Sequence, residues 1–357
     1  MKQTIKKISQ SKPGASQPNG SRLKIAPALS WPLLIILALF ALASCERVID
    51  FDTEMSQSQL VLNGVPSADK QLFIYYAYSR FFLDTGNVHP VPQADIVVSV
   101  NGRDYRPDSV SRCRYFFDYV VQEDDSVAVR IQSGDHFVTA HTRVPRKPQI
   151  SDIQTFRVDT IFNVLAVSFT INDHPDYKDY YRFSITHRDS GVVYHPFFDK
   201  YDTIDTVYTD YFFCLDPLMV NSAAASTDAI GDYFASATGY NIYSQMLVTD
   251  DAIDGQRHNT ALLVLLLKDT NELPTFIHQY SLHIETLSPD RFRYMQDLST
   301  ANSITQIITE PAPVYSNVQG ALGIFAGNAR QDIPLATLVT DSTGFMHKAP
   351  SHKKRRR

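Results

Sequence analysis

Residues 126–140, with the sequence SVAVRIQSGDHFVTA, decide the fold class. Val127, Val129 and Ile131 alternate with other residues, as on a β-strand that buries one of its two faces. Gly134 lies in a polar turn signal, and a second alternating run follows it. The stretch therefore predicts an antiparallel β-hairpin.

The hairpin belongs to a series of short predicted strands between residues 59 and 147. Asn101-Gly102, within residues 94–105, is the strongest short-range signal for a tight hairpin turn. Further strands are expected at 60–63, 72–78 and 115–120. About seven strands at this spacing predict a small antiparallel sandwich of immunoglobulin-like or transthyretin-like kind.

A basic linker bracketed by prolines, Val144 to Pro148, places a domain boundary after residue 147. Beyond the linker, alternating or continuously apolar runs predict strands at 165–171, 180–185, 261–267 and 276–284. Residues 148–345 are therefore expected to form a larger antiparallel β-sandwich. The whole body is predicted to be mainly β, with two sandwich domains.

One helix is expected in the second domain. Ser288, Pro289 and Asp290 are residue types typical of a helix N-terminus, and the helix is expected to run on to Leu298. Between Gly191 and Gly239 we expect long inserted loops.

The N-terminal 44 residues predict export and lipidation. An apolar core at 33–42, LLIILALFAL, is closer to a signal-peptide core than to a membrane span of about 20 residues, although a signal anchor stays an alternative. Leu42-Ala43-Ser44-Cys45 has the pattern of a bacterial lipobox. We expect residues 1–44 to be removed and Cys45 to carry acyl chains such as palmitate, which anchor the protein in a membrane. Residues 45–58 are expected to form a tether.

The distribution of charge argues against nucleic acid as a partner. The chain carries −5, and six basic residues lie in each of residues 1–44 and 348–357, so the body between them carries about −17. Binding to phosphates needs clustered Lys and Arg on a folded surface. Residues 346–357 are expected to be a disordered basic tail.

Motifs that carry known chemistry are absent from the sequence. It contains no Gly-x-Ser-x-Gly and no His-Glu-x-x-His, and the eleven histidines are scattered without zinc-site spacing. His278 and His283, on a predicted strand, favour packing or surface roles. We therefore expect no enzyme activity and no cofactor.

Asp250-Asp251-Ala252-Ile253-Asp254-Gly255 partly imitates a calcium loop. Asp250, Asp251 and Asp254 are the candidate ligands, but Ala252 occupies a ligand position and no glutamate closes the loop. A strand-end turn stabilised by Asx hydrogen bonds is the alternative that we favour.

Three glycines, Gly320, Gly323 and Gly327, have a spacing that invites comparison with a phosphate-binding loop. No Gly-Lys-Ser/Thr follows them, so close packing of two strands or a bulge explains them better.

An aromatic segment is the candidate partner-binding site. The segment contains Tyr208, Tyr211, Phe212 and Phe213, in the region of the expected loops. Tyr and Phe at alternate strand positions are usually core residues, and burial is therefore the alternative. Neighbouring residues on a strand point in opposite directions, so some of the four are expected to be exposed as interface anchors.

After lipidation two cysteines remain, Cys113 and Cys214, one in each predicted domain. An oxidising compartment permits a disulfide between them, but bridging requires Cα atoms within about 7 Å. Pairing and two free thiols both stay open.

Short motifs along the mature chain resemble those of a known family. They are CERVIDFD at 45–52, LVLNG at 60–64, DYYRF at 179–183, TDDAIDG at 249–255, PVYSNV at 313–318 and GALGIF at 320–325. In this order they resemble the domain-of-unknown-function family 4249, lipoproteins of Bacteroidota. The resemblance implies an exported β-rich lipoprotein, often encoded beside outer-membrane TonB-dependent receptors. It provides no catalytic residues to transfer.

The leading hypothesis is a non-enzymatic outer-membrane lipoprotein that serves a TonB-dependent receptor, on either the periplasmic or the surface face. The rival is an envelope hydrolase acting on glycans or peptides through a pair of carboxylates. A structural envelope component is the third alternative.

Overall fold

The computed structural model describes residues 58–80, 88, 90–159, 163–195, 200–225, 241–266, 277–301, 313–340 and 346–348. Residues 55–357 form one unit of the chain, separate from residues 1–54. The expected signal peptide, Cys45 and nearly all of the expected tether lie outside the described residues. In the part that is described, no helix has the length and apolar character needed to cross a membrane.

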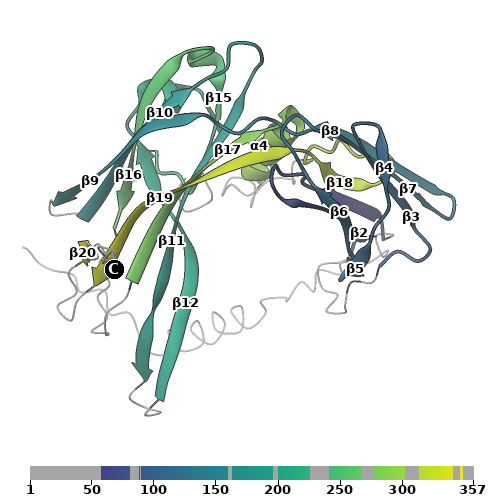
Figure 1. The fold of residues 1–357 in the computed structure, drawn as a ribbon, viewed down its shortest axis with the longest axis horizontal. Coiled ribbons are helices and arrows are strands. Elements are labelled where there is room, and N and C mark those ends of the chain that lie inside the picture. The colour runs from purple at the N-terminus through teal and green to yellow at the C-terminus, as the bar shows by residue number, and fades with distance from the viewer. Residues whose placement is uncertain are drawn as a thin grey trace, which may run out of the picture. The chain divides into compact units, whose positions relative to one another are not determined.

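Two sheets make up the N-terminal part of the body (Figure 1). The first contains β1 (Leu60–Gly64), β2 (Gln71–Tyr78), β5 (Ser109–Ser111), β6 (Arg114–Val120) and β18 (Leu322–Phe325), in the order β18-β1-β2-β6-β5. The second contains β3 (Asp95–Val100), β4 (Arg103–Tyr105), β7 (Ser126–Ser133) and β8 (His136–Arg143), in the order β4-β3-β7-β8. All pairings are antiparallel except that of β18 with β1.

One apolar core lies between these two sheets. Strand β7 buries Val127, Val129 and Ile131, as its alternating sequence predicts. The same cluster contains Leu62 and Ile74 from the opposite sheet. Burying the apolar face of each sheet against the other removes that area from water, which is the main driving force for forming the sandwich.

The chain returns to this N-terminal sandwich through a segment close to its C-terminal end. Strand β18 pairs with β1, and Phe325 belongs to the core of the N-terminal sheets. Residues 322–325 were expected in the second domain, so the sequence boundary after residue 147 does not separate the sheets completely. Gly327 follows directly, and an added Cβ there would lie 2.6 Å from the backbone oxygen of Arg143. Close packing therefore explains this glycine.

Two further sheets make up the C-terminal part. A four-stranded sheet contains β9 (Ile150–Asp159), β10 (Asn163–Asn172), β13 (Phe212–Cys214) and β16 (Arg257–Leu265), in the order β13-β16-β10-β9. A seven-stranded sheet contains β11 (Tyr180–His195), β12 (Lys200–Asp210), β14 (Ala223–Ala225), β15 (Gln245–Thr249), β17 (Ile277–Leu287), β19 (Asn328–Thr340) and β20 (Met346–Lys348). Its order is β14-β15-β11-β17-β19-β20, and β12 pairs with β11.

The second apolar core lies between these C-terminal sheets. It joins Val167 and Phe169 of β10 to Phe183 and Ile185 of β11 and to Leu282 of β17. On each strand these core residues occupy every second position, and the residue between two of them points to the other face of the sheet. The expectation of a mainly β fold made of antiparallel sheets is confirmed.

The expected helix is present as α4 (Pro289–Ala301). The hydroxyl of Ser288 accepts a hydrogen bond from the backbone N–H of Arg291 at 3.3 Å, which is the action of an N-cap. A short helix, α2 (Pro217–Asn221), and a 3₁₀ turn, η1 (Asp250–Ala252), were not expected.

The expectation of long loops between Gly191 and Gly239 is wrong for the described residues of that region. Strand β11 continues to His195, and β12 pairs with it over eleven residues (Figure 1). Strand β12 contains Thr, Ile, Val and Tyr, which favour strands, together with Asp residues, which are depleted in strands and are typical of loops. The beginning of the expected tail, Met346–Lys348, forms β20, and residues 349–357 lie outside the described part.

Candidate functional site

The outer face of the seven-stranded sheet carries polar side chains at regular intervals. On β11, Tyr181 and Phe183 enter the core, whereas Arg182, Ser184 and Thr186 point to the other face. This follows from the two-residue period of a strand. The same alternation brings side chains of the neighbouring strands to this face, so a polar surface forms opposite the apolar core.

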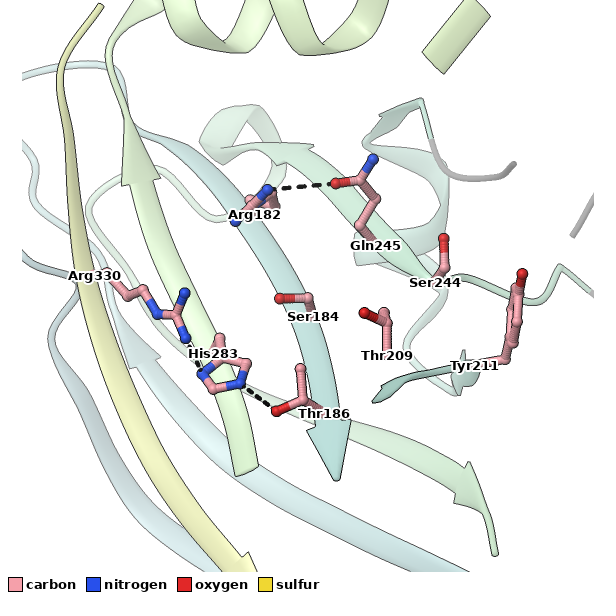
Figure 2. Close-up of a pocket in the computed structure, with 9 residues that line it drawn as sticks. All are labelled: Arg182, Ser184, Thr186, Thr209, Tyr211, Ser244, Gln245, His283 and Arg330. Atoms are coloured by element: carbon pink, nitrogen blue, oxygen red, sulfur yellow. Dashed lines mark hydrogen bonds between the residues drawn. The ribbon is translucent and has the colours of Figure 1, made fainter. Parts of the chain in front are cut away.

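These side chains line a pocket of about 440 Å³ (Figure 2). Five lining residues carry a hydroxyl group, namely Ser184, Thr186, Thr209, Tyr211 and Ser244. The others are Arg182, Gln245, His283 and Arg330. They lie on β11, β12, β15, β17 and β19, or directly after β12 and directly before β15. Pairing of strands that are distant in the sequence therefore creates the site.

A buried carboxylate organises the basic side of the pocket. Glu285 of β17 is 2% exposed and accepts a hydrogen bond from Nη2 of Arg182 at 2.5 Å. Nη1 of Arg330 lies 3.7 Å from the same oxygen, Oε1, and the other oxygen accepts a hydrogen bond from the side-chain amide of Asn328 at 3.2 Å. Burial lowers the pKa of Arg291 on α4, and the charge of nearby Arg182 lowers it further. Two guanidinium groups therefore lie at one buried carboxylate, and that of Arg291 interacts with it electrostatically.

His283 connects the basic side of the pocket to its hydroxyl groups (Figure 2). Its Nε2 lies 2.7 Å from the hydroxyl of Thr186, and its Nδ1 lies 2.7 Å from both Nη2 of Arg330 and a carboxylate oxygen of Asp332. Burial lowers the pKa of His283 below its usual value, and the charge of Arg330 acts in the same direction. The ring is therefore neutral at pH 7. A packing or surface role was expected for His283, and the structure places it in the wall of the pocket.

Some hydrogen-bond donors near the pocket have no acceptor. The Nε atoms of Arg182 and Arg291 are both buried, and neither has a partner among the described residues. A buried donor without an acceptor costs about 1 to 3 kcal/mol. The described part of the fold therefore leaves two buried guanidinium donors unsatisfied in this region.

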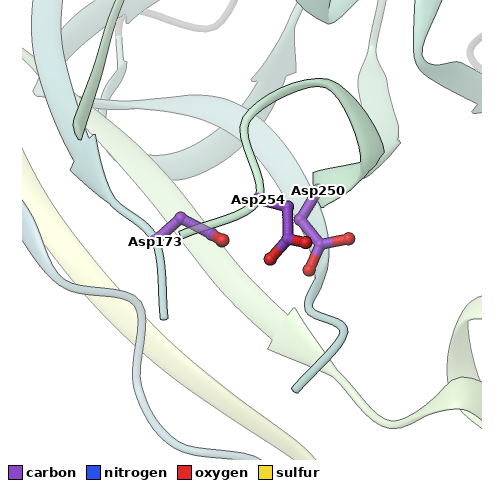
Figure 3. Close-up of side chains that lie close together, drawn as sticks. All are labelled: Asp173, Asp250 and Asp254. Carbon is purple, nitrogen blue, oxygen red and sulfur yellow. The ribbon is translucent and has the colours of Figure 1, made fainter. Parts of the chain in front are cut away.

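The structure brings two of the three candidate calcium ligands together. One carboxylate oxygen from each of Asp173, Asp250 and Asp254 lies within 4.8 Å of the others (Figure 3). Asp251 is elsewhere, because it accepts hydrogen bonds from Lys178 at 2.5 Å and from Thr249 at 2.7 Å. The group offers three carboxylate ligands, whereas Ca²⁺ takes about six to eight oxygens.

Protein donors already hold these carboxylates. Asp173 accepts from the hydroxyl of Tyr181 at 2.6 Å and from the backbone N–H of Gly255 at 2.8 Å. Asp250 accepts from the backbone N–H of Asp179. The residues 250–255 thus form a turn that is tied to the segment before β11, rather than a turn closed by its own Asx hydrogen bonds.

Asp179 is the most perturbed acid of this cluster. Burial and the negative charges of Asp173 and Asp250 raise the pKa of Asp179 to about 7. Burial likewise raises the pKa of Asp250. The cluster therefore carries negative charge that the fold only partly compensates, and it can take up a proton or a cation.

The four residues of the aromatic segment have different environments. Tyr208 on β12 is 46% exposed, and its ring stacks on His187 with centroids 5.0 Å apart. Phe212 is fully buried in the C-terminal core, so it offers no surface to a partner. Tyr211 lines the pocket, and Phe213 is half-buried.

A network of histidine and aspartate lies beside Tyr208. Nδ1 of His187 is 2.7 Å from Asp210, and Nδ1 of His278 is 2.6 Å from Asp189. Burial opposes protonation of His187, but the hydrogen bond and charge of Asp210 prevail and raise its pKa. His278 is buried, so the packing role expected for it is what the structure shows.

Both cysteines in the described part are free thiols. Cys113 is buried and Cys214 is half-buried, and burial raises the pKa of each thiol.

The comparisons with known proteins identify the family. The family model of a domain of unknown function (DUF4249) matches residues 46–332. The chain therefore belongs to this family. No curated protein matches it.

Solved structures that resemble the chain are distant. A DUF4785 family protein from Legionella pneumophila has 8% identity and a TM-score of 0.22, and the match covers 64% of this chain and 52% of that one. The collagen adhesin from S. aureus has 9% identity and a TM-score of 0.16, with 78% and 95% covered. The Enterococcus faecalis MSCRAMM ACE has 9% identity and a TM-score of 0.19, with the same coverage. Likenesses at this level carry no argument about function.

Sequence reasoning missed the pocket and Asp173. The available signal was the presence of charged residues inside strands, since Arg182, Glu285 and Arg330 each lie next to apolar core residues. Charged side chains at such positions are rare unless they are paired, so they mark a polar site on the sheet.

Proposed function

We propose that this protein is a lipid-anchored binding protein of the outer membrane in Bacteroidota. It acts without catalysis, as an accessory to a TonB-dependent uptake receptor. The lipobox that ends at Cys45 supports the anchor. The observation that carries the binding role is the edge of β12, where Val207 and Tyr208 are exposed.

Strand β12 offers a partner both backbone and side-chain contacts. It pairs with β11 and with no other strand among the described residues, so one edge keeps its backbone donors and acceptors for another chain. Val207 is 62% exposed and Tyr208 is 46% exposed. An open edge with large exposed side chains suits the addition of a strand from a partner protein. Stacking on His187 holds the Tyr208 ring, which reduces the entropy lost on binding.

A lipid anchor would strengthen a modest interface. A tether of about 14 residues reaches roughly 45 Å when it is fully extended. Confinement of both partners to one membrane raises their effective concentration, so a weak contact at β12 is sufficient.

Affinity isolation of the tagged lipoprotein from mild-detergent extracts tests this proposal. We expect a TonB-dependent receptor to be recovered with the wild type, and much less of it with Tyr208→Ser. Phe137→Ser is the matched control, because Phe137 is an aromatic residue on β8 that is 58% exposed. Recovery of no receptor by the wild type, or equal loss in both variants, contradicts the proposal.

A hydrolase acting on glycans or peptides is the second candidate. One observation favours it, namely that Asp179 has a pKa of about 7 beside Asp173 and Asp250. A carboxylic acid that is still protonated near neutral pH can act as a general acid. Release of reducing ends or amino groups from envelope glycans or peptides by the wild type, and its loss in Asp179→Asn, would favour this alternative.

A further inference from the structure

We propose that the pocket on the outer face of the seven-stranded sheet binds a sugar acid, a small molecule that carries one carboxylate and several hydroxyl groups. This inference rests on the proposed binding role, and it names the chemical class of a small ligand. It concerns the pocket and not the edge of β12.

The first argument is charge. Arg182 and Arg330 line the pocket, and the third guanidinium, that of Arg291, is close enough to Arg182 to affect it electrostatically. Glu285 is their shared buried anion, and Asp332 is a second acid that pairs with Arg330 at the exposed rim. Arg291 does not line the pocket, but with it three positive charges lie in this region against two negative ones, so the local electrostatic potential favours an additional anion.

The second argument is the geometry of the free donor. Nη2 of Arg182 donates to Glu285, and Nη1 donates to Gln245 at 3.5 Å. Its buried Nε has no partner among the described residues. A carboxylate is the acceptor that a guanidinium binds most effectively, because the bond is charge-assisted. A ligand carboxylate bound beside Arg182 and Arg330, which both line the pocket, would make a bond of this kind.

The third argument is the opposite wall of hydroxyl groups. The side-chain hydroxyls of Ser184, Thr209 and Ser244 have no hydrogen-bond partner within the described part of the chain, and all three residues line the pocket (Figure 2). Groups that both donate and accept match the hydroxyls of a sugar. A simple inorganic anion would leave this wall unused.

The size and polarity of the pocket agree with such a ligand. Pockets for small molecules span about 300 to 1,000 Å³ and are mostly lined by apolar side chains. This one measures about 440 Å³ and is lined by polar side chains throughout. It therefore selects a polar occupant of the size of one or two sugar rings.

Calorimetric titration of the full-length protein in mild detergent tests the inference. The probes are D-galacturonate, its neutral counterpart D-galactose, and sulfate, which is an anion without a sugar framework. We expect saturable binding of galacturonate, and affinities at least tenfold weaker for galactose and sulfate.

Variants locate the binding in the pocket. Arg330→Gln removes a charge of the basic side, and Ser184→Val fills space at the hydroxyl wall; each should weaken galacturonate binding at least tenfold. Arg182 is left intact because its loss would leave Glu285 buried without its close partner. Arg188→Gln is the matched control. Arg188 lies on β11, as Arg182 and Ser184 do, and it pairs with exposed Asp205 outside the pocket.

Each other outcome overturns the inference. Equal binding of galactose shows that charge is not recognised, and equal binding of sulfate shows a general anion site. No binding of galacturonate, or unchanged binding in both folded variants, shows that the pocket is not the site. Arg330→Gln leaves β12 intact, so this variant should still recover the receptor. Failure of the sugar-acid inference is therefore distinguishable from failure of the proposed function.

Discussion

The buried carboxylates around Tyr181 determine how the stability of this protein responds to pH. Asp179 is 8% exposed, and its pKa of about 7 lies well above the value of about 3.9 for an unfolded chain. Between these two values the folded state holds a proton that the unfolded state has released. The contribution of Asp179 to stability is therefore lost as the pH rises through this window, and it is constant above it.

Asp179→Asn should remove this pH dependence. We expect the variant to be more stable than the wild type at pH 8, by about 1 to 3 kcal/mol, because a neutral amide avoids the cost of a buried charge. At pH 4 the two proteins should have similar stabilities. Urea unfolding at both pH values measures the difference.

The control for this experiment is Asp176→Asn. Asp176 lies on the same segment, but its side chain is 79% exposed. The stability of this variant should follow that of the wild type at both pH values. A wild-type advantage over Asp179→Asn at pH 8 would show that the ionised carboxylate stabilises the fold.

Gly327 is a second position where a single residue decides stability. Its backbone N–H donates to the hydroxyl of Thr142 at 2.8 Å, and its oxygen accepts from the N–H of Ser288 at 2.9 Å. An added Cβ would lie 2.6 Å from the oxygen of Arg143. The residue thus joins β8, α4 and β19 at close range.

Gly327→Ala should lower the free energy of unfolding by about 1 to 3 kcal/mol, because the methyl group overlaps with backbone that cannot move freely. Thermal or urea unfolding measures this. Gly134→Asn is the control: Gly134 has open space around it, and asparagine tolerates its positive φ. Equal effects of the two substitutions would show that the close packing at Gly327 is unimportant.

At the scale of strands and helices, the sequence predicts which elements form but not how they pair. Alternation identifies β7, β8, β10 and β17, and the N-terminal residue types identify α4. Pairing of β18 with β1 joins segments about 260 residues apart, for which a single sequence has no signal. The pocket was missed for the same reason, because the Arg182 and Glu285 contact depends on β11 and β17 becoming neighbours.

The stability of the fold around β17 should depend on the negative charge of Glu285. Glu285→Gln keeps the shape of the side chain but leaves Arg182, Arg291 and Arg330 without their common buried anion. Breaking a buried ion pair costs about 3 to 5 kcal/mol, so we expect a loss of several kcal/mol in the free energy of unfolding. Glu123→Gln, at a residue whose side chain is 40% exposed, should change it little. Similar stabilities for both variants would contradict this role of Glu285.

At the scale of the whole molecule, the proposed anchor at Cys45 and the folded body from residue 58 onward lie in different parts of the chain. The mainly β class and the family were accessible from the sequence because many short motifs agree. The exposure of Tyr208 and the burial of Phe212 could not be predicted from the sequence, because nearby aromatic residues cannot be assigned to the core or the surface before the packing of the strands is known. Residues that look equivalent in the sequence thus have different roles in the fold.

Cys45→Ala should abolish the anchor. Without the lipobox cysteine there is no acceptor for the acyl chains, so we expect an unprocessed precursor that takes up no labelled fatty acid. Metabolic labelling followed by immunoprecipitation measures this, and Cys214→Ala is the control with a different cysteine removed. Equal labelling of Cys45→Ala and the wild type would exclude Cys45 as the lipidated residue.

Photo-crosslinking in intact cells would show whether the edge of β12 contacts a TonB-dependent receptor. A photoreactive amino acid at position 208 would report which protein lies against the edge of β12, and the same group at position 137 would serve as the reference. We predict a covalent adduct with a TonB-dependent receptor from position 208 and little or none from position 137. No adduct at position 208, or the same unrelated proteins captured from both positions, would contradict the account.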